Sequence, residues 1–183
     1  MTTQFTTTRG EGDLRQILDL QQENHKTNLI ESVRRGQGFV TVRHTWEQIY
    51  GLHNATPQII AQTEGRVVGY ALAMLPTAAM LIPDLQPMFV LFDQISWQDK
   101  KLMDCRYYVM GQVCVTQSHR GQGVFDGLYQ KHRELYRPNF DLLVTEVSAA
   151  NGRSLRAHER VGFRHIHTHT DHLDTWQVLA WEF

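Results

Sequence analysis

The stretch Val113-Cys-Val-Thr-Gln-Ser-His-Arg-Gly-Gln-Gly-Val-Phe125 decides the fold, because a strand pattern passes through a glycine loop into a helix pattern. The first turn of a helix carries unpaired backbone N–H groups and the positive end of the helix dipole. Glycines let that backbone approach an anion closely, and an arginine adds a permanent charge suited to phosphate. The stretch therefore predicts a phosphate-binding loop formed by Arg120, Gly121, Gln122, Gly123, Val124 and Phe125.

Two other phosphate-binding motifs do not fit this loop. A nucleotide-hydrolysing P-loop requires Lys and Ser or Thr directly after its last glycine, where Val124 and Phe125 stand. A dinucleotide-binding fingerprint requires a third glycine at the position of Asp126. The glycines could also serve only a tight turn from strand to helix, without any ligand.

The segments around the loop predict a mixed α/β fold, with one sheet and helices on both faces, over a single domain of residues 1–183. Gly65 lies in a four-residue turn between two β-rich runs, which indicates a hairpin. A Gly111-Gln112 pair inside a strand indicates a bulge or a close backbone approach. The expected strands are Phe5–Arg9, Phe39–His44, Ile59–Gln62, Val67–Met74, Tyr107–Thr116, Phe140–Val147, Arg164–His172 and Thr175–Phe183. The first expected helix begins after Asp13, which can cap it. The other expected helices cover Asn28–Arg35, Trp46–Tyr50, Gly123–Tyr136 and Asn151–Val161.

The composition is that of an ordinary globular protein. Of 183 residues, 42% are hydrophobic and 20% are charged, with a formal net charge of −1. This charge gives no bulk attraction to nucleic acid or to anionic membranes, so a polyanion would have to be held locally. Two cysteines are too few for a disulfide framework, and no apolar run resembles a signal peptide or a membrane span. We therefore expect a cytoplasmic protein.

Two motifs in this order resemble those of the GCN5-related N-acetyltransferase (GNAT) superfamily. The loop Arg120–Phe125 is similar to the family signature Gln/Arg-x-x-Gly-x-Gly/Ala, although Phe125 stands where a small residue is usual. A ring at that position has to turn into the core rather than face a pyrophosphate. The resemblance covers the second half of the chain well, and the first half only in the order of its elements.

The second motif lies on the helix that follows the next strand. Residues 151–163 are similar to Asn-x-x-Ala-x-x-x-Tyr-x-x-x-Gly-Phe, and Asn151, Gly162 and Phe163 agree with it. Ser154 replaces the small Ala, and His158 stands where Tyr is usual. Helical spacing allows the side chains at 151, 154 and 158 to face one groove.

The resemblance implies an acetyltransferase that moves an acetyl group from acetyl-CoA, its co-substrate, to a primary amine by direct attack in a ternary complex. It implies a central, mostly antiparallel sheet that splays open between Tyr107–Thr116 and Phe140–Val147. The pantetheine arm would pair with the main chain of Val113, Cys114 and Val115, and its pyrophosphate would bind at Arg120–Phe125. Asn151 and Ser154 would complete the cofactor site.

Two residues are candidates for proton transfer. The resemblance implies that His158 acts as the acid toward the CoA sulfur in place of Tyr, and the alternative is that it only packs or hydrogen-bonds there. Glu146 lies near the carboxyl end of its strand and is the candidate base; a surface or ion-paired carboxylate is the alternative. Cys114 is expected to be a plain buried thiol rather than a nucleophile, since no histidine lies near it in the chain.

Three alternating histidines leave a different class of function open. His165, His167 and His169 would share one face of a strand and could bind a metal ion, although residues two apart on one strand are awkwardly spaced for one ion. We expect no metal site. A relative that binds and senses CoA without turnover is the other alternative.

The acceptor cannot be named from the sequence beyond a small-molecule or peptide amine. The last predicted strand is rich in aromatic residues, and these could contribute to a homodimer: Trp176, Trp181 and Phe183.

Overall fold

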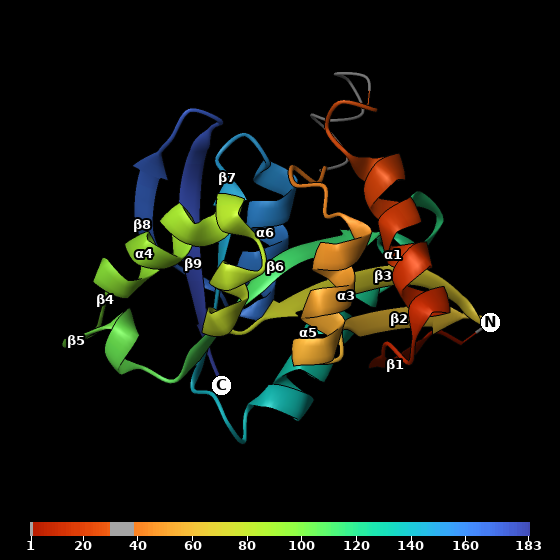
Figure 1. The fold of residues 1–183 in the computed structure, drawn as a ribbon, viewed down its shortest axis with the longest axis horizontal. Coiled ribbons are helices and arrows are strands. Elements are labelled where there is room, and N and C mark those ends of the chain that lie inside the picture. The colour runs from red at the N-terminus through yellow and green to blue at the C-terminus, as the bar shows by residue number, and fades with distance from the viewer. Residues whose placement is uncertain (1, 30–38) are drawn as a thin grey trace.

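The computed structural model describes residues 2–29 and 39–183, and one seven-stranded sheet runs through them in the order β1-β2-β3-β6-β7-β9-β8 (Figure 1). Every neighbouring pair is antiparallel except β6 and β7. The strands of this sheet are β1 (Gln4–Thr7), β2 (Ile59–Thr63), β3 (Arg66–Met74), β6 (Tyr107–Val115), β7 (Leu142–Ser148), β8 (Arg164–Thr170) and β9 (Thr175–Glu182). The helices are α1 (Glu11–Asn24), α3 (Trp46–Ala55), α4 (Gln86–Gln94), α5 (Val124–Tyr136) and α6 (Gly152–Val161). Short elements are η1 (Pro76–Met80), η2 (Pro83–Leu85), η3 (Leu102–Asp104), η4 (Gln117–His119) and a hairpin of β4 (Ser96–Trp97) and β5 (Lys100–Lys101).

Helices cover both faces of the sheet, as the sequence predicts (Figure 1). On one face, α1, α3 and α4 bury apolar residues such as Leu14, Ile49 and Phe92 against the strands. On the other face, α5 and α6 do the same around Leu128 and Phe163. The mixed α/β, mostly antiparallel architecture is thereby confirmed.

Among the described strands of the sheet, the one parallel pair, β6 with β7, separates after three residue pairs. Tyr107–Val109 pairs with 142–144, and the hydroxyl of Thr145 then donates to the carbonyl of Met110 at 2.9 Å. Beyond this point β6 continues to pair with β3, and β7 with β9. The predicted opening between the two strands is therefore present.

A bulge at Gly111 lies where the strands begin to separate. The register between β3 and β6 shifts there, because Leu72 pairs with Gln112 and Ala73 with Met110. A Cβ at Gly111 would collide with the side chain of Met74. The predicted bulge at the Gly111-Gln112 pair is confirmed, and the atoms that approach Gly111 belong to a side chain rather than to another backbone.

Several details of the first half differ from the prediction. Asp13 does not cap α1; Gly10 occupies the N-cap, and the carboxylate of Asp13 accepts from the backbone N–H of Arg9 at 3.0 Å. Segment 39–44 is not a strand, since it contributes only an isolated bridge of Val40 with His25. The predicted helix at 28–35 lies, from residue 30 on, outside the described residues.

The aromatic residues of the last strand belong to the interior of the chain. Trp176 and Trp181 are 7% and 6% exposed, so they offer little surface to a second subunit. The suggested homodimer thus loses the support that these tryptophans gave it and stays a prediction. None of the helices in the described ranges has the length and apolar character needed to cross a bilayer.

Burial lowers the pKa of three histidines, none of which has a charged partner among the described residues. Burial lowers the pKa of His44 to about 4, of His132 to about 3 and of His158 to about 4. In the unfolded chain the same groups have a pKa of about 6.5 and bind protons more readily. Folding stability must therefore fall as the pH drops below this value.

We expect the free energy of unfolding to decrease by about 2 kcal/mol per buried histidine between pH 7 and pH 5. Urea denaturation at the two pH values measures the difference, and calorimetry at pH 5 should detect proton uptake on unfolding. An unchanged denaturation midpoint would contradict the buried, neutral state of these side chains.

Candidate functional site

The glycine loop between β6 and α5 is open to a ligand. Gly121 and Gly123 have φ angles of 75° and 79°, in the left-handed region that favours glycine. Nothing lies within 4 Å of the place where either Cβ would be, and Gly123 is the N-cap of α5. The first backbone N–H groups of α5 therefore border free space, which is the geometry of an anion site.

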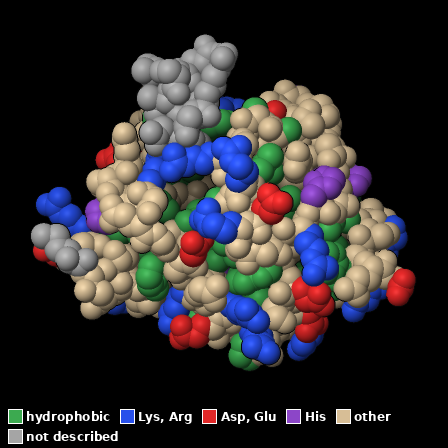
Figure 2. Space-filling model, turned by 180° about the vertical axis from the view of Figure 1, so that it is seen from behind, with side chains coloured by type: hydrophobic (Ala, Val, Ile, Leu, Met, Phe, Trp, Pro, Cys, Tyr) green, Lys and Arg blue, Asp and Glu red, His purple; other side chains and the backbone are tan. Residues whose placement is uncertain are grey.

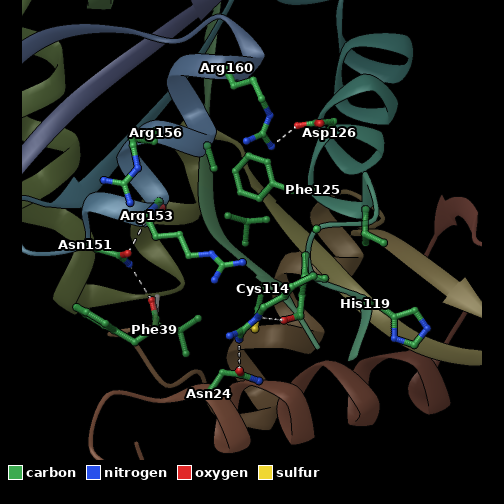
Figure 3. A pocket seen from close by; sticks show the side chains of 18 of the residues that line it. Asn24, Phe39, Cys114, His119, Phe125, Asp126, Asn151, Arg153, Arg156 and Arg160 are labelled. Atoms are coloured by element: carbon green, nitrogen blue, oxygen red, sulfur yellow. Dashed lines mark hydrogen bonds and ion pairs between the residues drawn. The ribbon is translucent and has the colours of Figure 1, made fainter. Parts of the chain in front are cut away.

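Arg120 adds positive charge at the same place. Its guanidinium donates to the carbonyl of Val115 at 2.9 Å and to the side-chain oxygen of Asn24 at 2.6 Å (Figure 3). Partial burial lowers the pKa of Arg120, and the nearby charge of Arg153 lowers it further. Two like charges held together in a concave site favour a bound anion.

A pocket of about 460 Å³, here called the outer pocket, extends from this loop to α6 (Figure 3). Ten of the eleven predicted cofactor residues line it. Gln122 is the exception among the described residues, and its side-chain amide donates to the carbonyl of Ser118 at 2.8 Å. The ten lining residues are Val113, Cys114, Val115, Arg120, Gly121, Gly123, Val124, Phe125, Asn151 and Ser154.

The Phe125 ring turns toward the core, as expected from its size. It packs 4.9 Å from the ring of Tyr129 and meets the ring of His158 edge-on at 5.1 Å. One side of the ring still borders the outer pocket. The large residue therefore leaves the loop open.

A second, smaller pocket, here called the inner pocket, lies in the opening between β6 and β7. Its volume is about 100 Å³, and Gly111, Gln112, Glu146 and His158 contribute to its lining. The two pockets have five residues in common, namely Phe39, Val40, Val113, Asn151 and Ser154. A ligand with a long, thin arm can therefore run along β6 from the phosphate loop to the opening.

Asn151 also shapes α6. Its side-chain oxygen accepts from the N–H of Ser154 at 3.2 Å, and its amide donates to the carbonyl of Phe39 at 3.3 Å. Asn151 is thus the N-cap of the helix. Through Phe39 it also holds a segment that lines both pockets.

His158 is neutral and has a partner at each ring nitrogen. Nδ1 lies 2.8 Å from the carbonyl oxygen of Ser154, which can only accept, so Nδ1 carries the hydrogen. Nε2 then accepts from the hydroxyl of Tyr129 at 2.6 Å. The Ser154 hydroxyl lies 3.3 Å from Nδ1, and it offers the route from the imidazole to the pockets. Proton donation by His158 stays a prediction, now restricted to that route.

Glu146 is hydrogen-bonded to a histidine, a contact that is an ion pair only when the imidazole is protonated, and it also lines the inner pocket. Its Oε2 lies 2.9 Å from Nε2 of His169, and the two side chains are 17% and 20% exposed. Burial raises the pKa of Glu146, while the hydrogen bond and charge of His169 lower it. The nearby charge of Asp171 raises it again. A partly buried carboxylate with an elevated pKa suits a general base.

The three alternating histidines do not share a face. A bulge lies between His165 and His167, which pair with the consecutive residues Leu179 and Val178 of β9. His165 therefore points away from His167 and His169, whose rings stack at 6.4 Å. No group of three potential ligands close enough to hold a metal ion occurs within the described ranges.

Burial raises the pKa of Cys114 to about 12, so its thiol is protonated at neutral pH. This agrees with the expectation of a plain buried thiol and leaves little nucleophile for a covalent acetyl-enzyme.

Sequence reasoning missed the positive wall of the outer pocket. Arg153, Arg156 and Arg160 all line it from α6. Their spacing of three and four residues places them on one helical face, and this pattern could have been recognised in the sequence. Figure 2 shows this side of the molecule, where blue side chains gather around a hollow.

Comparisons with known proteins agree with this geometry. Residues 14–163 match the model of the Acetyltransferase (GNAT) family. No curated protein sequence matches significantly. Among solved structures, Ard1 from Thermoplasma volcanium is 14% identical with a TM-score of 0.67, over 100% of this chain and 98% of that one. NAA60 of Arabidopsis thaliana, solved in complex with acetyl-CoA, is 14% identical with a TM-score of 0.63, over 100% of both chains. An N-acetyltransferase from Staphylococcus aureus Mu50 is 16% identical with a TM-score of 0.63, over 100% of this chain and 99% of that one.

Replacing Gly123 by Asp should weaken CoA binding by about 100-fold or more, because a carboxylate would face the pyrophosphate at short range. Gly65→Asp is the matched control, since Gly65 has nearly the same φ, 78°, and equally open surroundings outside both pockets. Isothermal titration calorimetry measures both variants. Equal affinity in the two would remove the loop from the binding site.

Proposed function

Because the chain belongs to the GNAT acetyltransferase family, we propose that it transfers the acetyl group of acetyl-CoA to a primary amine by direct attack in a ternary complex. The observation that carries this proposal is the continuity of the two pockets along β6. One end has a glycine loop and arginines suited to phosphates, and the other end opens between β6 and β7 beside Glu146. Acetyl-CoA supplies the activated thioester.

The residues present fit this co-substrate. The open loop at Gly121 and Gly123 suits the pyrophosphate, because any side chain there would fill the space. Val113, which borders both pockets, suits the pantetheine arm through its main chain. The protonated Cys114 cannot readily carry the acetyl group, and this supports direct attack.

Glu146 would accept the proton of the attacking amine, which is a cation at neutral pH before it reacts. His169 would hold the carboxylate in place by donating from Nε2, and its ring stacks on that of His167. Ser154, backed by His158, would donate toward the departing sulfur. The cytoplasm remains the expected location, with Cys105 and Cys114 both free thiols.

A CoA-sensing module is the second candidate. The bonded state of both nitrogens of His158 favours it, because no strongly acidic donor faces the inner pocket from that side chain.

An acceptor screen separates the two candidates. We expect release of free CoA thiol from acetyl-CoA with at least one class among peptide N-termini, lysine side chains, polyamines, aminoglycosides and amino acids. The Gly123→Asp variant should abolish that release. Binding of CoA without acceptor-dependent thiol release across the whole panel would contradict the enzyme and support the sensor.

With an acceptor in hand, kcat/KM should rise with pH through the elevated pKa of Glu146, because only the carboxylate accepts a proton. Glu146→Gln should lower kcat by about 100-fold or more. His169→Asn should move the acidic limb to higher pH, because the contact that lowers the pKa of Glu146 is lost. His165→Asn is the control, since its side chain points to the other face. An identical shift of the pH profile in both histidine variants, or no shift in His169→Asn, would contradict the role of His169 beside Glu146.

A further inference from the structure

The arginines of α6 form a continuous charged face on the outer pocket. Figure 3 shows Arg153 reaching across the pocket toward Cys114, with Arg156 beside it on the same helix. Arg160 donates to a carboxylate oxygen of Asp126 at 2.8 Å and so joins α6 to the first turn of α5. Arg156 is exposed at the rim and has no ion-pair partner in the described part of the chain. Its Nη1 would be 3.3 Å from a Cβ at position 152, where Gly152 leaves room for it.

This face is displaced from the reaction end of the site. Asn151 and Ser154, near the start of α6, line both pockets. Arg153, Arg156 and Arg160 line the outer pocket but not the inner pocket. A ligand whose acetyl end lies between β6 and β7 must therefore present its nucleotide end to these arginines.

The charges of CoA exceed what the glycine loop can accommodate. The loop and Arg120 provide donors for the pyrophosphate, at the start of α5. CoA carries one further anionic group, the phosphomonoester on the 3′ position of its ribose, with nearly two negative charges at neutral pH. Guanidinium groups bind such phosphates through paired, charge-assisted hydrogen bonds.

We infer that Arg153 and Arg156 bind the 3′-phosphate of CoA, so that the protein selects CoA over 3′-dephospho-CoA, its form without this group. The inference rests on the proposed function, because it places CoA in the outer pocket. Arg160 contributes by holding α6 at its distance from α5 through Asp126.

The test compares two ligands and three variants of the full chain by calorimetry. The wild type should bind CoA more tightly than 3′-dephospho-CoA. Arg156→Gln should weaken CoA binding by about tenfold, as expected for one charge-assisted contact, and leave 3′-dephospho-CoA binding unchanged. The double variant Arg153→Gln/Arg156→Gln should bind the two ligands equally. Arg164→Gln removes the same charge from an exposed position at the start of β8 that lines neither pocket, and it should change neither affinity.

Two results would overturn the inference. One is an equal loss of affinity for both ligands in Arg156→Gln, which would assign the arginine to the pyrophosphate. The other is a wild type that binds both ligands equally well. If the wild type bound neither ligand, the proposed function itself would fail, and this outcome differs from both of the others.

Discussion

The separation of β6 from β7 is the constraint on which the rest of the site depends. A continuous sheet would satisfy the backbone groups of both strands and leave no room for a ligand arm. Here only three residue pairs join the strands, and the bulge at Gly111 redirects β6 where the pairing ends. The strands remain paired on their outer sides with β3 and β9, so the opening is held from both sides. A thioester can be positioned there without a large rearrangement of the sheet.

Local charge explains how a protein with a net charge of −1 can bind a polyanion. Arg120 and the arginine face of α6 surround a single concave surface, which concentrates their field. Burial lowers the pKa of Arg120, and the nearby charge of Arg153 lowers it as well, so holding these cations together opposes folding. That cost is offset when an anion with matching charges is bound. The site therefore couples ligand binding to stability through the same groups that recognise the ligand.

The sequence predicted the second half of the chain better than the first for a physical reason. The glycine loop and the capped helix α6 rest on local chemistry: positive φ at Gly123, an Asn at the N-cap and a Gly at the C-cap. These features are visible in a short window. Segment 39–44 instead takes its conformation from long-range contacts, such as that between Phe39 and Asn151, and periodicity does not report them. The prediction that His165, His167 and His169 share one face was wrong. One bulge, at a position without glycine or proline, reversed the alternation of side chains on which that prediction depended.

His158 stands where the family motif has Tyr, and in the proposed reaction this would change the chemistry available at the sulfur. A phenol in that position could project its own proton into the opening, whereas the shorter imidazole stops within α6 and gives its hydrogen to Ser154. Tyr129, which lies on α5, donates a hydrogen bond to the other ring nitrogen, Nε2. Because burial keeps the ring neutral, any proton passed outward must be replaced through that tyrosine. The thiolate of CoA is a stable leaving group with a pKa near that of other thiols, about 8.5. In the proposed reaction a weak hydrogen-bond donor such as the hydroxyl of Ser154 would then be sufficient. The demanding proton transfer would lie on the amine side, at the proposed base Glu146.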